Sequence, residues 1–162
     1  MDFKNQTLEF FDNKIVDEQG IEVMMDWESS IMQKSAEFIC QNKGDILEIG
    51  FGMGICADYI QEQGVNSHTI FEIHPQIIEK LKIWASNKSN VTIIEGDWNN
   101  VSGLSTYDGI FLDTFGDNNW NNFNEENNEH SFDSISFESI SISPNSNSYM
   151  NGDTYYMPKV EL

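Results

Sequence analysis

The stretch Leu47–Ile55, LEIGFGMGI, constrains the fold of this chain more than any other part of the sequence. A short apolar run leads into three alternate glycines, Gly50, Gly52 and Gly54, and then into residues with helical periodicity, ICADYIQEQG. Glycine adopts positive φ angles and has no side chain, so a ligand can approach the backbone N–H groups of such a turn. The stretch therefore predicts a buried strand, a ligand-binding loop and a helix.

Four apolar runs alternate with helical patterns between Ile31 and Phe115. DILEIG, HTIFEI, VTIIEGDW and YDGIFLDTF are short and nearly continuous, as expected for strands that are covered on both faces. IMQKSAEFICQ, ICADYIQEQG and PQIIEKLKIWA have the apolar spacing of helices, and Pro75 opens the last of them. Strands and helices that alternate with short joins predict an α/β fold with a mostly parallel sheet and right-handed crossovers.

The two ends of the chain follow other patterns. VMMDWESSIM (Val23–Met32) fits either an apolar helix that packs into the core or a lid over a site. Residues 117–131 are rich in Asn, Asp and Glu and predict a surface linker. In residues 132–162, SISFESISISP alternates apolar and polar residues and TYYMPKVEL ends the chain, which predicts an antiparallel hairpin. We therefore expect one domain with a lid segment at 1–30, a ligand-binding half at 31–116, the linker and the hairpin.

The net charge restricts the partners of this domain. The 162 residues carry a formal charge of −19, and the eight basic residues are scattered lysines. Such a surface would repel nucleic acid and an anionic membrane and would attract a cation. Cys40 and Cys56 lie in helix-like stretches without a secretory signal, so we expect reduced thiols in a cytoplasmic protein. The His and Cys residues lack metal-ligand spacing, so no metal site is predicted.

Glu72 narrows the choice of ligand for the glycine loop. It ends the second predicted strand 20 residues after Gly52, where a carboxylate can accept hydrogen bonds from both hydroxyls of a ribose. In a dinucleotide-binding loop the third glycine comes one residue later than Gly54, at the position that Ile55 occupies here. Glu48 would repel a pyrophosphate, but it suits the amino group of a methionyl moiety. The pattern therefore favours S-adenosylmethionine over NAD.

Further polar residues follow the predicted strands. Asp97 and Trp98 end the third strand, where they could accept the exocyclic amine of adenine and pack against its ring, although Trp98 also suits a core-capping role. His74 suits a nucleoside contact and the closing of the turn before Pro75 equally well. Asp113 ends the fourth strand, where it would face the transferring methyl group or cap a following helix.

Several of these motifs together resemble the guanidinoacetate N-methyltransferases and the related fungal arginine N-methyltransferase 2 family. The resemblance rests on VMMDWESSIM, LEIGFGMGICA, HTIFEIHPQIIEKLKIWA, EGDW and YDGIFLDTF, in family-like order and spacing, from about Gly20 to Asp117. YYMPKVEL resembles the last strand of that family. The resemblance implies a Rossmann-like, S-adenosylmethionine-dependent methyltransferase that acts on a guanidino group, either of a small cationic molecule or of arginine.

The resemblance also implies roles for individual residues. Glu28 and Asp113 would hold the guanidino group, with Asp113 as the proton acceptor and Glu28 as the orienting partner. A guanidinium is planar and permanently charged, so paired carboxylates match it. Together with Glu48, the residues expected around the cofactor are Met24, Met32, Gly50, Phe51, Gly52, Met53, Gly54, Ile55, Glu72, Ile73, His74, Asp97 and Trp98.

The sequence departs from this family after Asp117. Where the family continues with a helix, a fifth strand and another helix, this chain passes directly to the hairpin. A sheet of about six strands results if the hairpin pairs with the fourth strand, and the apolar surface left exposed could accept a partner subunit in a homo-oligomer. Three functions remain: an active guanidino methyltransferase with a reduced acceptor pocket, a cofactor-binding or assembly protein that has lost catalysis, and, third, a nicotinamide-dependent oxidoreductase.

Overall fold

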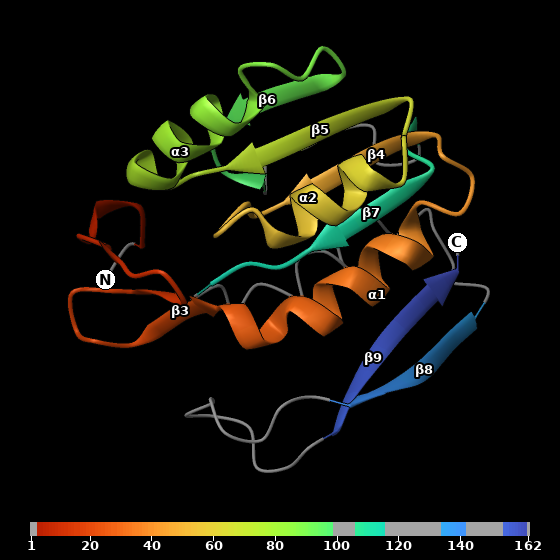
Figure 1. Cartoon of the computed structure of the whole chain (residues 1–162), viewed down its shortest axis with the longest axis horizontal. Helices are drawn as coiled ribbons and strands as arrows, with labels where there is room; N and C mark the ends of the chain where they lie inside the picture. Colours follow the sequence, from red (N-terminus) through yellow and green to blue (C-terminus); the bar gives the residue numbers. More distant parts are fainter. Residues whose placement is uncertain (1–2, 99–105, 116–133, 142–153, 162) are drawn as a thin grey trace.

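The computed structural model describes residues 3–98, 106–115, 134–141 and 154–161, and its centre is a parallel sheet (Figure 1). The strand order is β6-β5-β4-β7, and every neighbouring pair is parallel. The strands are β4 (Asp45–Ile49), β5 (Ser67–Glu72), β6 (Val91–Glu95) and β7 (Gly109–Leu112). They coincide with the four apolar runs, so the predicted Rossmann-like α/β fold is confirmed.

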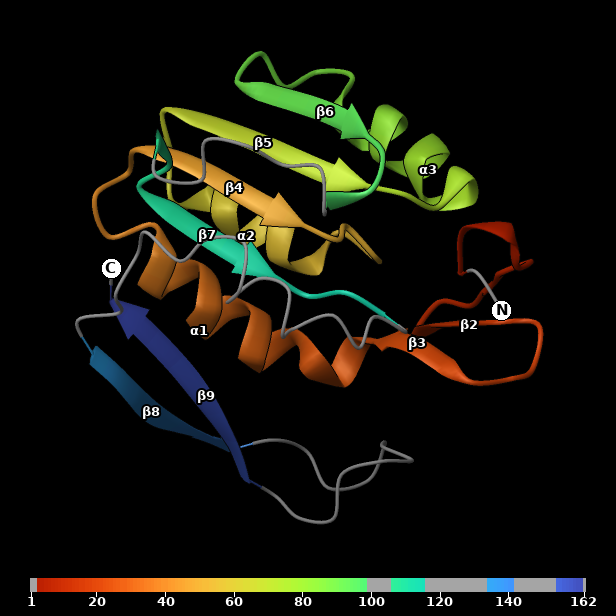
Figure 2. The same ribbon diagram turned by 180° about the vertical axis from the view of Figure 1, so that it is seen from behind.

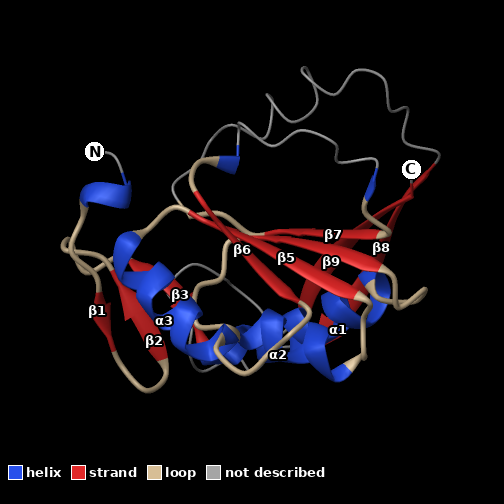
Figure 3. Ribbon diagram, turned by 90° about the horizontal axis from the view of Figure 1, so that it is seen from above, coloured by secondary structure: helices blue, strands red, loops and turns tan. Residues whose placement is uncertain are grey.

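Three helices lie on one face of this sheet (Figure 3). They are α1 (Ser29–Ile39), α2 (Ile55–Glu62) and α3 (Pro75–Ala85). Because side chains alternate along a strand, Ile46 packs with the helices, whereas Leu47 and Ile49 join Phe71 and Trp98 in a cluster on the opposite face. The same alternation places Glu48 on the helix face, in phase with Ile46.

A small antiparallel sheet precedes α1. Its strands are β1 (Glu9–Phe10), β2 (Lys14–Val16) and β3 (Glu22–Met25), and short 3-10 helices η1 (Phe3–Asn5) and η2 (Asp26–Glu28) flank it. The segment Val23–Met32 is therefore a strand, a 3-10 turn and the start of α1, and its interpretation as a single apolar helix is wrong. The strand sends neighbouring methionines to different clusters: Met24 packs with α1 and α2, whereas Met25 packs with Trp27.

The C-terminal hairpin has the predicted antiparallel pairing but another position. Its strands are β8 (Ser134–Ser141) and β9 (Thr154–Glu161), and among the described residues they form a two-stranded sheet of their own. The hairpin lies beside α1 (Figures 1 and 2) and does not extend the central sheet next to β7. Ile140 explains this, because it is buried with Met25, Trp27 and Ile31 on a second apolar face around α1.

Two further expectations concern segments along the chain. The predicted linker at 117–131 lies outside the described residues. Within the described part of the chain, no helix has the length and apolarity needed to cross a membrane.

Candidate active site

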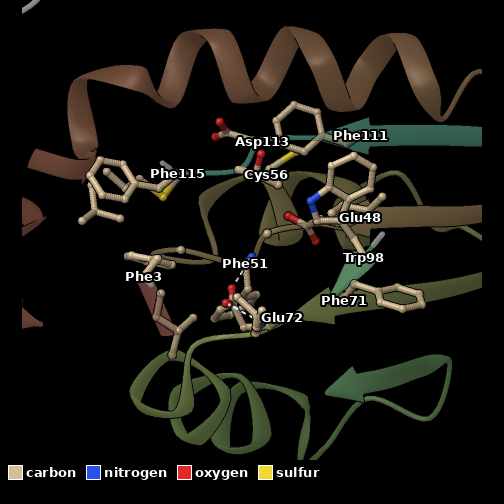
Figure 4. A pocket seen from close by; sticks show the side chains of 18 of the residues that line it. Phe3, Glu48, Phe51, Cys56, Phe71, Glu72, Trp98, Phe111, Asp113 and Phe115 are labelled. Atoms are coloured by element: carbon tan, nitrogen blue, oxygen red, sulfur yellow. Dashed lines mark hydrogen bonds between the residues drawn. The ribbon is translucent and has the colours of Figure 1, made fainter. Parts of the chain in front are cut away.

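A pocket of about 540 Å³ lies at the carboxyl ends of the parallel strands (Figure 4). The chain moves outward from β4 through β5 to β6 and then returns to the other side of β4 for β7, so the strand order reverses at β4. Ligands of open α/β sheets bind at such a reversal. The pocket lining there includes Gly50 after β4, Glu72 at the end of β5, Asp97 after β6 and Asp113 after β7.

The glycine loop packs against both neighbouring strands of the pocket. Gly50 and Gly52 have φ angles of +91° and +54°, which favour glycine. A Cβ on Gly50 would collide with the carbonyl oxygen of Asp113, and one on Gly52 would collide with the sulfur of Met24. The same sulfur accepts a hydrogen bond from the backbone N–H of Met53 at 3.0 Å. The loop therefore needs glycine because protein atoms approach it closely, in addition to any ligand.

Backbone N–H groups hold the carboxylate of Glu72 in place. One oxygen accepts from Phe51 at 2.9 Å, and the other accepts from Ile73 and His74, each at 2.9 Å. The side chain is 5% exposed and lines the pocket. A carboxylate has about four acceptor sites, so these bonds leave room for a further donor mainly at the oxygen that faces Phe51. The predicted position of Glu72 in the site is therefore observed, with an orientation fixed before any ligand arrives.

Glu48 forms a buried pair with a histidine that the sequence analysis did not connect to the site. One Glu48 oxygen lies 2.8 Å from His68 Nε2, and both side chains are 0% exposed. His68 Nδ1 lies 3.2 Å from the amide nitrogen of Gln61 on α2. The second Glu48 oxygen, Oε1, is buried without a hydrogen-bond partner among the described residues, and Glu48 lines the pocket.

The environment of Glu48 raises its pKa. Burial is the largest cause, and the His68 hydrogen bond and charge oppose it, whereas the charges of Asp113 and Glu72 add to the rise. A donor or cation next to Oε1 would favour the ionised form again. A signal for His68 existed in the sequence, since it alternates with Ile70 along β5 and therefore faces the helices, as Glu48 does on β4.

Glu28 and Asp113, the predicted guanidino ligands, both line this pocket. One Glu28 oxygen accepts the backbone N–H of Met25 at 2.9 Å, which fixes the carboxylate to the end of β3. Asp113 has no side-chain hydrogen bond to other described residues, while its N–H donates to Ile49 O at 3.0 Å. Solvent reaches the Asp113 carboxylate, yet the protein around it displaces enough water to raise its pKa.

Most of the other predicted residues also lie in the pocket lining, while some have structural roles. Met24, Met32, Phe51, Ile73, Asp97 and Trp98 line it. Trp98 also packs on the opposite-face cluster, in agreement with the core-capping alternative, and its contact with adenine stays a prediction. His74 does not line the pocket: its ring accepts the N–H of Gln76 and caps α3, as the turn-closing alternative predicted. Met53, Gly54 and Ile55 also lie outside the lining, at the start of α2.

Several pocket residues were not predicted from the sequence, because only the tertiary structure brings them together. Phe3 is an example, because its ring packs against His74 and Phe115 at centroid distances of 5.0 and 5.2 Å. The missed lining residues are Phe3, Lys4, Ile21, Glu22, Val23, Ile49, Cys56, Phe71, Ile77, Gly96, Phe111, Thr114 and Phe115. Those next to strand ends could have been inferred from their neighbours, whereas the N-terminal ones carry no local signal.

The pocket is strongly acidic. Its lining contains six carboxylates, Glu22, Glu28, Glu48, Glu72, Asp97 and Asp113. Lys4 is the one basic residue in the described lining, and the whole chain contains no arginine. Glu22 forms an ion pair with Lys14, with 3.1 Å between the lysine nitrogen and a carboxylate oxygen. No group of three or more side chains suited to a metal ion occurs in the described ranges. A cleft lined by charges of one sign attracts the opposite charge, so this lining suits a cationic ligand.

Comparison with known proteins agrees with this geometry. The sequence model of the guanidinoacetate N-methyltransferase family matches residues 6–149. The chain belongs to this family. Protein arginine N-methyltransferase 2 of Kluyveromyces lactis is 38% identical over 121 residues, which cover 67% of this chain and 30% of the relative. The Saccharomyces cerevisiae protein of the same name is 39% identical over 122 residues, covering 67% of this chain and 29% of its own length.

This family member thus spans about 30% of the length of these curated relatives. Among solved structures, a putative RNA methyltransferase from Pyrococcus horikoshii aligns with 83% of this chain and 81% of its own. The TM-score is 0.46 and the identity is 11%, so this likeness adds nothing to the assignment.

Proposed function

We propose that this chain is an S-adenosylmethionine-dependent N-methyltransferase that acts on a guanidino group, of a small cationic molecule or of an arginine side chain. The observation that carries the proposal is the convergence of the glycine loop, Glu72, Glu28 and Asp113 on one acidic pocket at the switch point of the sheet. Membership of the guanidinoacetate N-methyltransferase family supports the same chemistry.

The described residues fit the proposed cofactor. Glu72 has a fixed carboxylate at the end of β5 for the ribose hydroxyls, and Asp97 and Trp98 after β6 suit the adenine. The unpartnered oxygen of Glu48 suits the amino group of the methionyl part, because a buried carboxylate oxygen gains most from a charged donor. When bound, S-adenosylmethionine would supply a methyl group on a positively charged sulfur.

Glu28 and Asp113 would bind and activate the acceptor. Two carboxylates can hold a guanidinium in one plane and orient one nitrogen toward the methyl group. Transfer of the methyl group to that nitrogen would leave the electron pair of the sulfur–carbon bond on sulfur. The nitrogen loses a proton, which Asp113 accepts. The raised pKa of Asp113 favours this role, because a more basic carboxylate is a better proton acceptor.

The N-terminal segment would act as a lid that completes the pocket. Val23 and Met24 of β3, and Phe3 of η1, line the pocket together with the strand ends. Met24 contacts the glycine loop directly, through the hydrogen bond from Met53 N–H to its sulfur. Glu28 follows β3 immediately, so closure of this segment would bring the orienting carboxylate to the acceptor.

Methyl transfer from labelled S-adenosylmethionine to guanidinoacetate, arginine and an arginine-containing peptide tests the proposal. We expect at least one labelled product, and a loss of about 100-fold or more in Asp113→Asn, as for removal of a general base. Asp108→Asn is the matched control, because Asp108 lies at the opposite end of β7, where it accepts the N–H of Asp45 at 2.7 Å. The control should keep its activity.

Two results would count against the proposal. Unchanged transfer in Asp113→Asn would remove Asp113 from the mechanism. Calorimetric binding of NAD without binding of S-adenosylmethionine would contradict the cofactor assignment.

A further inference from the structure

The buried pair of His68 and Glu48 has a geometry that goes beyond packing. His68 comes from β5, Glu48 from β4 and Gln61 from α2, and the pair is 0% exposed. The His68 ring lies nearly perpendicular to the ring of Trp84 on α3, with a centroid distance of 6.2 Å. Four elements of the fold therefore enclose one imidazole behind the wall of the pocket.

Gln61 fixes the tautomer of His68. Its amide nitrogen can only donate, so His68 Nδ1, 3.2 Å away, must accept. In the neutral imidazole the proton then lies on Nε2, which points at Glu48 at 2.8 Å. Gln61 thus donates to His68, and His68 donates to Glu48, whose carboxylate belongs to the pocket lining.

The Glu48 end of these hydrogen bonds has an unused acceptor. Glu48 Oε2 accepts from His68, whereas Oε1 is buried with no partner among the described residues. Figure 4 shows Glu48 among the side chains that line the pocket. A buried acceptor without a donor is costly, so this oxygen is poised to receive a hydrogen bond from a ligand.

We propose that His68 is a positioning residue for the cofactor. In the tautomer set by Gln61, His68 donates to one oxygen of Glu48 and holds the carboxylate so that its other oxygen binds the ammonium group of the methionyl moiety. This inference rests on the proposed function, because it requires a ligand with an amino-acid end in this pocket. It assigns a role in cofactor affinity to two residues, His68 and Gln61, that do not line the pocket.

Two ligands separate this role from a purely structural one. S-adenosylhomocysteine carries the amino-acid end, and 5′-methylthioadenosine has the same nucleoside and sulfur without it. In His68→Asn, the shorter side chain no longer reaches Glu48 with a donor. We expect the calorimetric Kd for S-adenosylhomocysteine to rise about 10- to 100-fold, as for loss of a hydrogen bond to a charged group. The Kd for 5′-methylthioadenosine should change less than about threefold, because this ligand lacks the amino-acid end that would contact Glu48.

Conservative variants strengthen the test. The amide of His68→Gln extends about as far as Nε2 and should restore most of the affinity for S-adenosylhomocysteine. Gln61→Met removes the donor to Nδ1 from a partly exposed helix position and should weaken the same ligand selectively even if His68→Asn does not fold. Equal losses for both ligands, or unchanged affinity for S-adenosylhomocysteine, would overturn the positioning role. Failure of the unsubstituted protein to bind either ligand would instead overturn the proposed function, and this inference with it.

Discussion

Replacement of Gly50 by alanine tests whether the glycine loop and Asp113 form one rigid unit. Gly50 has a φ of +91°, and a Cβ there would collide with the carbonyl oxygen of Asp113. The positive φ alone costs a residue with a Cβ about 1–2 kcal/mol. The carbonyl group cannot retreat freely, because the N–H of Asp113 donates to Ile49 O at 3.0 Å.

The collision therefore adds to the backbone cost. Loss of the hydrogen bond between Asp113 and Ile49 would cost about 1 kcal/mol, and strain in the surrounding packing about 1–3 kcal/mol. We expect Gly50→Ala to lower the free energy of unfolding by about 3–6 kcal/mol. Methyl transfer by the folded fraction should fall about 100-fold, because a shift of about 1 Å in a reacting group has that effect.

Gly64→Ala provides the matched control. Gly64 has a φ of +71°, and nothing lies within 4 Å of a Cβ built on it, so this variant carries only the backbone cost. Urea denaturation should show a loss of about 1–2 kcal/mol, with methyl transfer unchanged. Equal losses of unfolding free energy in the two variants, or full activity in Gly50→Ala, would refute the coupling between the loop and Asp113.

Three other predictions follow from burial and charge. Because the pKa of Asp113 is raised, its proton-accepting form should be lost as the pH falls through a pKa above that of an exposed aspartate. A pH profile of kcat/KM would contradict this if its acid limb lay at or below the pKa of an exposed aspartate. The described pocket lining has six carboxylates and one lysine, so agmatine should be a better acceptor than 4-guanidinobutyrate, which ends in a carboxylate instead of an ammonium group. A higher kcat/KM for 4-guanidinobutyrate would exclude this selection by charge. Burial and, to a smaller extent, the nearby charge of Glu48 raise the pKa of Cys40 to about 11. Iodoacetamide at neutral pH should therefore label Cys40 only after denaturation. Rapid labelling of the native protein would show that the core around Cys40 is open.

Local sequence patterns were sufficient to predict the parallel sheet and much of the pocket. The strands of the central sheet are apolar runs bounded by turns, and the glycine loop, Glu72 and Asp113 follow strand ends that meet at one edge. The sequence pattern of Val23–Met32 was ambiguous because it fits a helix as well as a strand. Its two adjacent methionines pack in different clusters. The position of the hairpin was not predictable, since it depends on Ile140 covering the second apolar face around α1. His68 was overlooked because its alternation with Ile70 indicates the face of the sheet that it occupies, but does not show that it pairs with Glu48.

The hydrogen bonds of the pocket carboxylates separate binding from proton transfer. Glu72 accepts three backbone N–H groups, Glu28 accepts one, and Glu48 accepts the His68 ring. Hydrogen bonds fix the orientation of a carboxylate, which suits a group that binds a hydroxyl, an ammonium or a guanidinium. Asp113 has no such donor among the described residues, and partial displacement of water by the surrounding protein raises its pKa. Among Glu28, Glu48, Glu72 and Asp113, Asp113 alone has no donor in the described part of the chain, so it would be the most suitable base of the four. A donor introduced beside Asp113 would lower its basicity and slow transfer, even if guanidino binding were preserved.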